Sequence, residues 1–306
     1  MQNTLVIGSI NMDLVIQTAR LPKLGETVMG QGFSMVPGGK GANQAVAAAR
    51  LGSRVKMLGC LGRDVYGDVL LEHLRVSGVL TDSILRADSS SGVAVITVCQ
   101  GDNHIILDPG ANGKLDADAV RRSEALIAWA DTLLLQFEIP MDAVETAMEL
   151  AERYGTRVVL NPSPMKALRP ELYPKVGLLV VNEFEAGQLL GREICSLEDA
   201  GRAIAGLEEL GFREAVITLG KRGSVFRHDG RILHQDIFRV ETVDTTGAGD
   251  SFLGGLCAAL GRDMAIPEAV RFAAAASALA VSRMGAGPSI PTRQETENFL
   301  KQVHSG

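Results

Sequence analysis

The most constraining feature of this sequence is a regular alternation of short apolar runs with segments of helical length. In the middle of the chain it reads strand, helix, strand over Thr132–Gln136, Met141–Tyr154 and Arg157–Leu160. Parallel strands are buried on both faces and are joined by crossover helices, and this alternation is typical of them. We therefore predict an α/β fold with three layers, in which a doubly wound, mostly parallel sheet lies between helices.

The alternation continues on either side, and 306 residues suffice for one large domain, so we predict a single domain over residues 1–306. The further expected strands are Thr4–Gly8, Val55–Cys60, Leu178–Val181 and Glu214–Thr218, and the further expected helices are Gly41–Leu51, Tyr66–Ser77, Glu183–Leu190 and Leu197–Leu210. Gly52, Gly78 and Gly211 stand where three of these helices should end.

Two stretches depart from this rhythm. Residues 11–36 contain two polar or glycine-rich turns and no good helix, and residues 92–107 have the pattern of a β-hairpin that turns at Gly101-Asp-Asn103. Both predict a small β element outside the main sheet. It could be an antiparallel edge extension or a lid over an active site, and the pattern favours neither.

Charge and cysteine usage restrict the partners. The formal net charge is −6, whereas nucleic-acid-binding domains are usually basic. The four cysteines form no C-x-x-C pair, which disfavours a zinc site or a disulfide framework and fits a reducing cytoplasm. The N-terminus has no basic leader, and the apolar run Phe272–Val281 is about half the roughly 20 residues that span a bilayer. We expect a cytoplasmic protein that binds neither nucleic acid nor membrane.

The strongest chemical signal is the segment Val243–Gly255, where an apolar strand should end near Val243 and a helix should begin near Ala248. Between them Gly247, Ala248 and Gly249 leave backbone N–H groups accessible at the positive end of the helix, which suits an anion. Asp250 follows in the first helical turn. It is either a carboxylate that stabilises the helix start or a general base beside an anion hole, as phosphoryl transfer to an alcohol requires.

A second signal is Gly38-Gly-Lys-Gly-Ala-Asn43, in which three glycines surround Lys40 ahead of a helix. Glycine is abundant in this chain, with 34 residues, and it allows a backbone to approach a ligand closely. The segment is either a flexible turn or a loop that directs Lys40 and Asn43 at a polar ligand. It is not a Walker A loop, because Gly41 follows the lysine.

Four further polar motifs follow predicted strands. Asn11 and Asp13 could grip sugar hydroxyls or form an Asx turn, and Glu138 has the same placement. The carboxylates of Asn182-Glu-Phe-Glu185 could cap a helix or hold a metal-bound water near phosphates. A nucleotide could lie across Thr218-Leu-Gly-Lys-Arg-Gly223.

The six motifs share one predicted location. Five lie at predicted strand ends and the other, Gly38–Asn43, opens a helix. Because parallel strands end at the same edge of a sheet, and ligands bind beyond that edge in open α/β sheets, we expect the six to form one site.

Together these motifs resemble the ribokinase family of carbohydrate kinases, also called the PfkB family. The resemblance runs from Gly8-Ser-Ile-Asn-Met-Asp13 to Gly285-Ala-Gly-Pro-Ser-Ile-Pro291, and its most specific parts are Gly38–Asn43 and Asp244-Thr-Thr-Gly-Ala-Gly-Asp250. It implies a three-layer fold whose β-sheet lid, about residues 11–36 and 92–107, also forms the contact of a homodimer. It also implies transfer of the ATP γ-phosphate to the 5-hydroxyl of ribose.

The resemblance also assigns roles to residues. Asp250 would be the base and the amides of Gly247, Ala248 and Gly249 the anion hole. The sugar would be held by Asn11, Asp13, Gly38, Gly39, Lys40, Gly41, Asn43 and Glu138. ATP, with Mg²⁺ or another divalent cation, would be bound by Asn182, Glu185, Thr218, Gly220, Gly223, Gly249 and Ala274. A K⁺ activator would lie among Asp244, Thr246, Ala280, Arg283, Gly285 and Ser289.

Two positions depart from the family's usual pattern. Ala274 stands where many members carry a polar residue near the adenine, and Phe137 is bulkier than the expected leucine, which could alter the sugar pocket. The alternatives to a ribose kinase are a kinase for deoxyribose or another small sugar, a phosphosugar kinase, and a non-catalytic sugar-binding regulator. The presence of Asp250 argues against the last, and the shortage of basic residues near Lys40 argues against a phosphosugar substrate.

Overall fold

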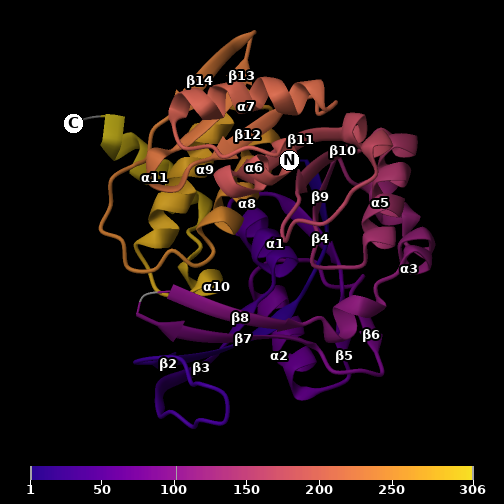
Figure 1. Ribbon diagram of the computed structural model, residues 1–306. Coiled ribbons are helices and arrows are strands. Elements are labelled where there is room, and N and C mark those ends of the chain that lie inside the picture. The colour runs from indigo at the N-terminus through magenta and orange to yellow at the C-terminus, as the bar shows by residue number, and fades with distance from the viewer. Residues whose placement is uncertain (1, 101, 305–306) are drawn as a thin grey trace.

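The computed structural model describes residues 2–100 and 102–304, and its centre is one large sheet (Figure 1). Its strands run parallel to one another except at one edge, where each of the last two is antiparallel to the strand before it. In order across the sheet the strands are β14 (Arg231–Gln235), β13 (Ser224–His228), β12 (Ala215–Thr218), β11 (Val176–Asn182), β10 (Arg157–Asn161), β9 (Thr132–Gln136), β1 (Asn3–Ile7) and β4 (Arg54–Leu58).

Helices cover both faces of this sheet, and each face has its own apolar core. In β1, for example, Leu5 and Ile7 face one core and Val6 faces the other, as the alternation of side chains along a strand requires. The first core is covered by α3 (Ala117–Arg122), α4 (Glu124–Trp129), α5 (Met141–Tyr154), α6 (Glu183–Leu190) and α7 (Leu197–Glu209). The second is covered by α1 (Lys40–Arg50), α2 (Val65–Val76), α8 (Ala248–Leu260), α9 (Ile266–Val281) and α11 (Arg293–His304). The predicted three-layer α/β architecture is confirmed.

A second sheet lies below the main one in Figure 1. Its strands, in spatial order, are β3 (Gly30–Gly38), β2 (Asn11–Thr18), β7 (Gly92–Cys99) and β8 (Asp102–Asp108). A small β element outside the main sheet is thus confirmed, and it is a separate sheet, so the alternative of an edge extension is wrong. The remaining short elements are β5 (Cys60–Gly62) paired with β6 (Leu85–Ala87), α10 (Ala286–Ser289), and the 3-10 turns η1 (Gly110–Lys114), η2 (Pro170–Lys175) and η3 (Gly220–Arg222).

Two local predictions need correction. The hairpin turn is shorter than expected, because Asp102 and Asn103 already belong to β8 and Asp102 pairs with Cys99, while Gly101 lies outside the described residues. The expected strand ending at Val243 is wrong, because residues 236–247 form neither helix nor strand. The backbone N–H of Val243 donates instead to the carbonyl of Val281 at the end of α9, at 2.8 Å.

Other boundaries agree with the sequence pattern. Gly52, Gly78 and Gly211 follow helices with φ values of +110°, +88° and +109°, the left-handed region in which glycine ends helices readily. In the part of the chain that the structure describes, we find no helix that is both long and apolar enough to cross a membrane.

Candidate active site

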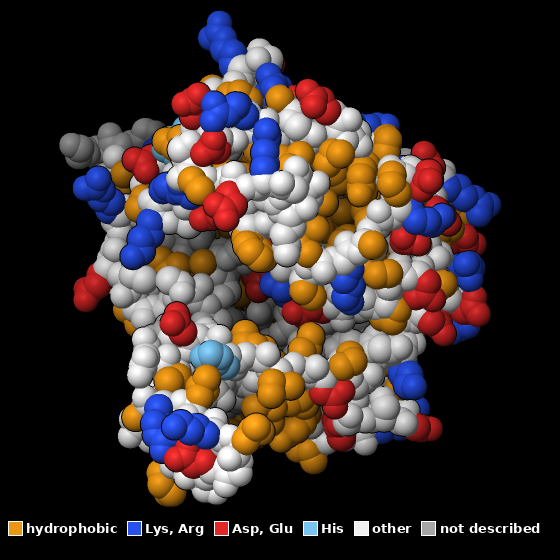
Figure 2. Space-filling model, viewed as in Figure 1, with side chains coloured by type: hydrophobic (Ala, Val, Ile, Leu, Met, Phe, Trp, Pro, Cys, Tyr) orange, Lys and Arg blue, Asp and Glu red, His pale blue; other side chains and the backbone are white. Residues whose placement is uncertain are grey.

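The candidate site lies where the main-sheet strands end. Asn11 follows β1, Glu138 follows β9, Asn182 ends β11 and Thr218 ends β12. Three of the six motifs therefore stand at main-sheet strand ends, whereas Asn11 and Asp13 lie at the start of β2 in the second sheet. Asp250 reaches the site from the first turn of α8, and the Gly38–Asn43 motif from the junction of β3 and α1. Figure 2 shows that the surface is hollowed between the main body and the four-stranded sheet, and charged side chains are visible inside the hollow.

Asp250 is held by two amides from α1. Asn43 Nδ2 donates to Asp250 Oδ2 at 3.2 Å, and Gln44 Nε2 donates to Asp250 Oδ1 at 2.9 Å. Burial raises the pKa of Asp250, whereas Lys40 and the two amide hydrogen bonds oppose the rise by stabilising the charged form. A carboxylate with fixed geometry and a raised pKa can accept a proton from an alcohol in this place.

The backbone before Asp250 is open on one side. Gly247 precedes α8 with a φ of +76°, and Gly249 has space beside it, since a Cβ added there would meet nothing within 4 Å. The N–H groups of a first helical turn have no partner within the helix, and the helix dipole favours an anion there. The Ala248 N–H is already engaged with the carbonyl of Thr245 at 3.3 Å. Of the three predicted anion-hole residues, Gly249 is the one with open space beside its Cα.

Glu138 connects three elements of the predicted sugar site. Its Oε2 accepts hydrogen bonds from Ser9 Oγ at 2.6 Å, from the Lys40 backbone N–H at 3.2 Å and from Asn11 Nδ2 at 3.5 Å. Burial, with the nearby carboxylates of Glu138 and Asp250, raises the pKa of Asp13 to about 7. Near neutral pH this group can therefore either donate or accept a hydrogen bond, as the hydroxyls of a sugar also do.

The glycines of the Gly38–Asn43 loop face protein. A Cβ on Gly38 would collide with the Asp13 carboxylate, and one on Gly41 would lie 2.6 Å from the backbone nitrogen of Ser9. Gly39 has a φ of +91°, and its added Cβ would lie 2.8 Å from the backbone nitrogen of Asn11. These glycines let the loop pack against the β1–β2 segment, which places Asn11, Asp13 and Lys40 around one space.

Asn112 is a site-organising residue that the sequence reading missed. It lies in η1, is 1% exposed, and its Nδ2 donates to Asn11 Oδ1 at 2.7 Å. It also exchanges hydrogen bonds with the backbone of Ile10, accepting at 2.9 Å and donating at 3.1 Å. The Asn11 amide is therefore fixed with its nitrogen toward Glu138. The Gly-Ala-Asn-Gly turn at residues 110–113 is the signal that could have indicated this role.

Three more buried amides were also missed: Gln44, Gln136 and Asn161. Gln136 Nε2 donates to Gln44 Oε1 at 2.6 Å, and Gln44 Nε2 lies 3.5 Å from Asn161 Oδ1. Asn161 Nδ2 in turn lies 3.5 Å from Glu185 Oε2. Gln136 and Asn161 are register partners at the ends of β9 and β10, so the strand-end argument could have identified both.

On the predicted nucleotide side, Asn182 and Glu185 form a capping box at the start of α6. Glu185 N donates to Asn182 Oδ1 at 2.7 Å, and Glu185 Oε2 accepts from Asn182 N at 3.0 Å. The capping reading is confirmed, and the carboxylate remains a possible oxygen ligand for a hard cation or its waters. The other predicted nucleotide residues are Thr218, Gly220, Gly223 and Ala274. The Thr218 hydroxyl donates to the Val181 carbonyl at 3.4 Å, and Ala274 is half-buried on α9. Gly220 has open space around it, whereas Gly223 packs on the backbone of Gln235.

Asp244 joins the two loops of the predicted K⁺ site. Its Oδ1 accepts from Thr246 N and its Oδ2 from Gly285 N, both at 2.9 Å. Burial raises the pKa of Asp244, but these hydrogen bonds outweigh it, so the pKa lies below its usual value and the group is ionised. The Arg283 side chain pairs with Glu295 at 2.7 Å, and its backbone N–H donates to Ala280 O at 3.1 Å. Ser289, the last residue of α10, is fully buried. The ionised Asp244 carboxylate supplies a negative charge that fits a monovalent cation.

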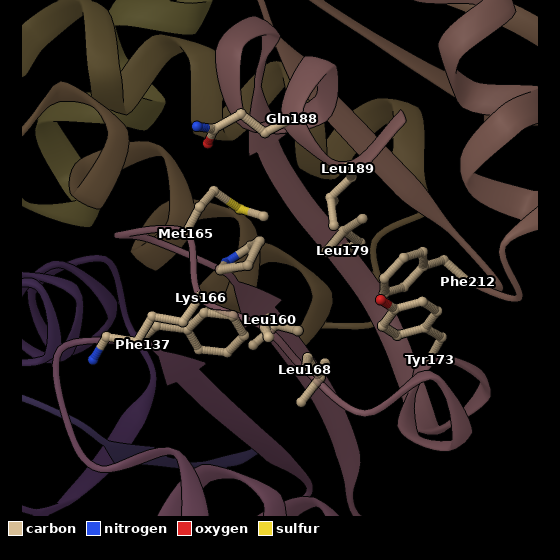
Figure 3. A pocket seen from close by; sticks show the side chains of 12 residues that line it. Phe137, Leu160, Met165, Lys166, Leu168, Tyr173, Leu179, Gln188, Leu189 and Phe212 are labelled. Atoms are coloured by element: carbon tan, nitrogen blue, oxygen red, sulfur yellow. The ribbon is translucent and has the colours of Figure 1, made fainter. Parts of the chain in front are cut away.

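A cavity of about 420 Å³ is lined by other residues and contains none of the carboxylates of this site. Figure 3 shows the Phe137 ring in that cavity beside Leu160 and Lys166. Phe137 follows the end of β9 and is buried in the first apolar core, where it lines this cavity, whereas the Gln136 side chain before it bonds to Gln44 on α1. The expectation that Phe137 alters the sugar pocket has no support in this arrangement.

Comparison with known proteins gives consistent matches over the whole chain. Residues 1–293 match the description "pfkB family carbohydrate kinase". A ribokinase from Haemophilus influenzae is 42% identical and aligns over 99% of this chain and 100% of its own length. A deoxyribokinase from Salmonella typhi is 33% identical over 96% and 97% of the two chains. The structure of Arabidopsis thaliana ribokinase complexed with ribose and ATP superposes with a TM-score of 0.91, at 33% identity, over 98% of this chain and 99% of that one.

Proposed function

The chain belongs to the pfkB family of carbohydrate kinases, and from that premise we propose that it phosphorylates ribose at the 5-hydroxyl with ATP. The observation that carries this proposal is the junction at α8. The Asp250 carboxylate, fixed by Asn43 and Gln44, directly follows Gly249, whose Cα has open space beside it. A base next to an unfilled helix N-terminus is what phosphoryl transfer to an alcohol requires.

In the proposed reaction the sugar 5-oxygen attacks the γ-phosphorus, and its proton passes to the Asp250 carboxylate. The bond from the γ-phosphorus to the β–γ bridging oxygen breaks, and ADP leaves. The backbone at Gly247, Ala248 and Gly249 stabilises the charge on the transferred phosphoryl oxygens. Gly249 is the open member of the three, and the Ala248 N–H would have to leave the Thr245 carbonyl to take part. Asn11, Asp13, Lys40, Asn43 and Glu138 hold the sugar hydroxyls, while Gly38, Gly39 and Gly41 let these side chains converge.

ATP would lie over Asn182, Thr218, Gly220, Gly223 and Ala274, with Glu185 near its phosphates. In residues 2–100 and 102–304 no group of three His, Cys, Asp or Glu side chains could hold a metal ion by itself. Mg²⁺ at nucleotide sites needs only one or two carboxylates, because phosphates and water supply the other ligands, and Glu185 fits that role. When bound, such a cation neutralises charge on the β- and γ-phosphates.

The test of substrate is a panel of acceptors assayed for ADP formation: ribose, deoxyribose, fructose, fructose 6-phosphate and adenosine. We expect the highest kcat/KM with ribose. A second candidate, deoxyribose, is favoured by the Salmonella relative and would show itself as a reversed preference in the same assay. A kinase that reads a buried hydroxyl should discriminate strongly against the analogue that lacks it. Equal or higher kcat/KM for any other acceptor would overturn the assignment of ribose.

We also propose that K⁺ activates the enzyme through Asp244, Thr246, Ala280, Arg283, Gly285 and Ser289. Turnover should be severalfold faster in K⁺ than in a tetramethylammonium buffer of equal ionic strength. The reason is that an ion between the Asp244 and Gly285 loops would fix the backbone that leads into α8. Equal rates in the two buffers would contradict this proposal.

The four-stranded sheet (about residues 11–36 and 92–107) is proposed to be both lid and dimer contact. Its strands β3, β7 and β8 expose Phe33, Met35, Val95, Ile105, Ile106 and Leu107, and Figure 2 shows hydrophobic side chains gathered on this part of the surface. Exposed apolar residues on an edge strand favour a partner chain. Light scattering should give twice the mass of one chain. Ile106→Lys should lower it and Val303→Lys on α11 should not; a monomeric wild type would contradict the proposal.

A further inference from the structure

Gln44 lies beside the candidate base and is the centre of a buried chain of side-chain amides. It is fully buried, as is Gln136, and it contacts Asp250, Gln136 and Asn161. Among the described residues, Gln44 and Gln136 make no direct hydrogen bond to a residue proposed to hold the sugar or ATP, and they are linked to those residues only through Asp250 or Asn161. Their position therefore needs an explanation other than substrate binding.

The hydrogen bonds leave one consistent orientation for the Gln44 amide. An ionised carboxylate only accepts, so Gln44 must present its nitrogen to Asp250, and the 2.9 Å contact is of that kind. Its oxygen is then directed at Gln136, whose nitrogen donates at 2.6 Å. Turning Gln136 over would place two amide oxygens against each other. Gln136 keeps this orientation although its own Oε1 is buried with no partner in the described part of the chain.

From these contacts we propose that Gln44 is a positioning residue, oriented by Gln136, which fixes the Asp250 carboxylate and stabilises its charged form. The inference rests on the proposed role of Asp250 as base. It assigns a task to a residue directly after Asn43 that touches neither the sugar nor the phosphoryl group. The supporting physical reason is that a donor to a buried carboxylate favours ionisation, whereas burial alone opposes it.

Other charged groups also influence the ionisation of Asp250, and a test of Gln44 must leave these groups unchanged. Lys40 on α1 favours the carboxylate, whereas Glu138 after β9 and Asp13 on β2 disfavour it by like-charge repulsion. Asn43 supplies the second donor, at 3.2 Å. None of these groups is altered by replacing Gln44 or Gln136 with methionine, which keeps the length of the side chain and removes the amide.

The test is the pH dependence of kcat for the intact enzyme with saturating ribose and ATP. Gln44→Met should move the acidic limb of the profile upward by about one pH unit. The rate loss would then be about tenfold at low pH and largely recovered at high pH, with the KM for ribose changed less than about threefold. Gln136→Met should shift the limb in the same direction, and the double variant should shift it no further than Gln44→Met alone, because both act through one amide.

The matched control is Gln188→Met on α6, which lies at the separate cavity and should leave the profile in place. An acidic limb that stays in place in Gln44→Met would overturn the proposal, as would additive shifts in the double variant. If Gln44→Met does not fold, an unshifted profile in Gln136→Met overturns it equally. Asp250→Asn, measured in parallel, distinguishes a failure of the proposed base from a failure of the proposed role of Gln44. High activity in that variant would remove the base itself, whereas an inactive Asp250→Asn with an unshifted Gln44→Met removes only the role of Gln44.

Discussion

Replacing Asp250 by asparagine is expected to lower kcat for ribose phosphorylation by about two to four orders of magnitude, with the KM for ribose nearly unchanged. Asparagine has the same shape and cannot take up the 5-hydroxyl proton. Its oxygen can accept from only one of the two donors that now converge on the carboxylate, Asn43 at 3.2 Å and Gln44 at 2.9 Å. Steady-state kinetics with ribose and ATP give both constants.

The stability of Asp250→Asn should fall much less than its kcat, so that the loss of catalysis can be told apart from a loss of folding. Because the pKa of Asp250 is raised in the folded protein, the folded state holds this proton more tightly than the unfolded chain does. The stability contributed by the protonated group is therefore lost as pH rises above the unfolded pKa, and the asparagine variant should show a weaker loss. Asp229→Asn, at the exposed β13–β14 turn, is the control for both measurements. Asp250→Asn with near-normal kcat would eliminate Asp250 as the base.

The sequence pattern predicted the layered fold because parallel strands that are buried on both faces have short, recognisable apolar runs in the sequence. The run Thr132–Gln136 has three consecutive leucines at its centre and is buried at every position, and it is β9 with the predicted bounds. The prediction of a strand ending at Val243 was wrong because the local pattern does not contain the contact that decides its structure. That segment has strand-like residues, but it lies beside the end of α9 and pairs with Val281, a tertiary contact that no local pattern encodes.

The candidate site was predictable where its residues follow strands and unpredictable where they lie inside elements. Glu138 and Asn182 could be located from the strand ends alone. Gln44 is one polar residue in the buried first turns of α1, and a single amide there leaves no periodic signal. Its partner Gln136 is the last residue of β9, beside Asn161 at the end of β10, and these two could have been located from the strand ends as Glu138 and Asn182 were.

The glycines of the site also divide into two kinds. The abundance of glycine in the chain suggested backbone close to a ligand, and for Gly249 in α8 the open space agrees with that interpretation. For Gly39 the neighbours are protein atoms, because a Cβ would lie 2.8 Å from the Asn11 nitrogen and 3.0 Å from the Ser9 carbonyl oxygen. Close approach to a ligand and close packing against protein backbone both require glycine. The sequence alone does not distinguish the two, whereas the neighbours in the structure do.

That distinction predicts opposite results for two alanine substitutions. Gly39→Ala should lower the free energy of unfolding by about 2–4 kcal/mol, since it combines a left-handed φ of +91° with backbone contacts that cannot move aside. It should also raise the KM for ribose at least tenfold, because relief of the clash displaces Asn11. Gly249→Ala, whose new methyl group would meet nothing within 4 Å outside its own helical turn, should keep or slightly raise stability and lose turnover.

Chemical denaturation and steady-state kinetics on the two variants decide between the readings, with Gly201→Ala as the control. Gly201 lies within α7, and its added methyl group makes an ordinary 3.5 Å contact with Ile232, so neither stability nor KM should fall. A Gly39→Ala protein as stable as the wild type would mean that the β1–β2 segment can yield. Asn11 would then not be held by this packing, and the close fit of the loop could not be the reason that glycine stands at position 39.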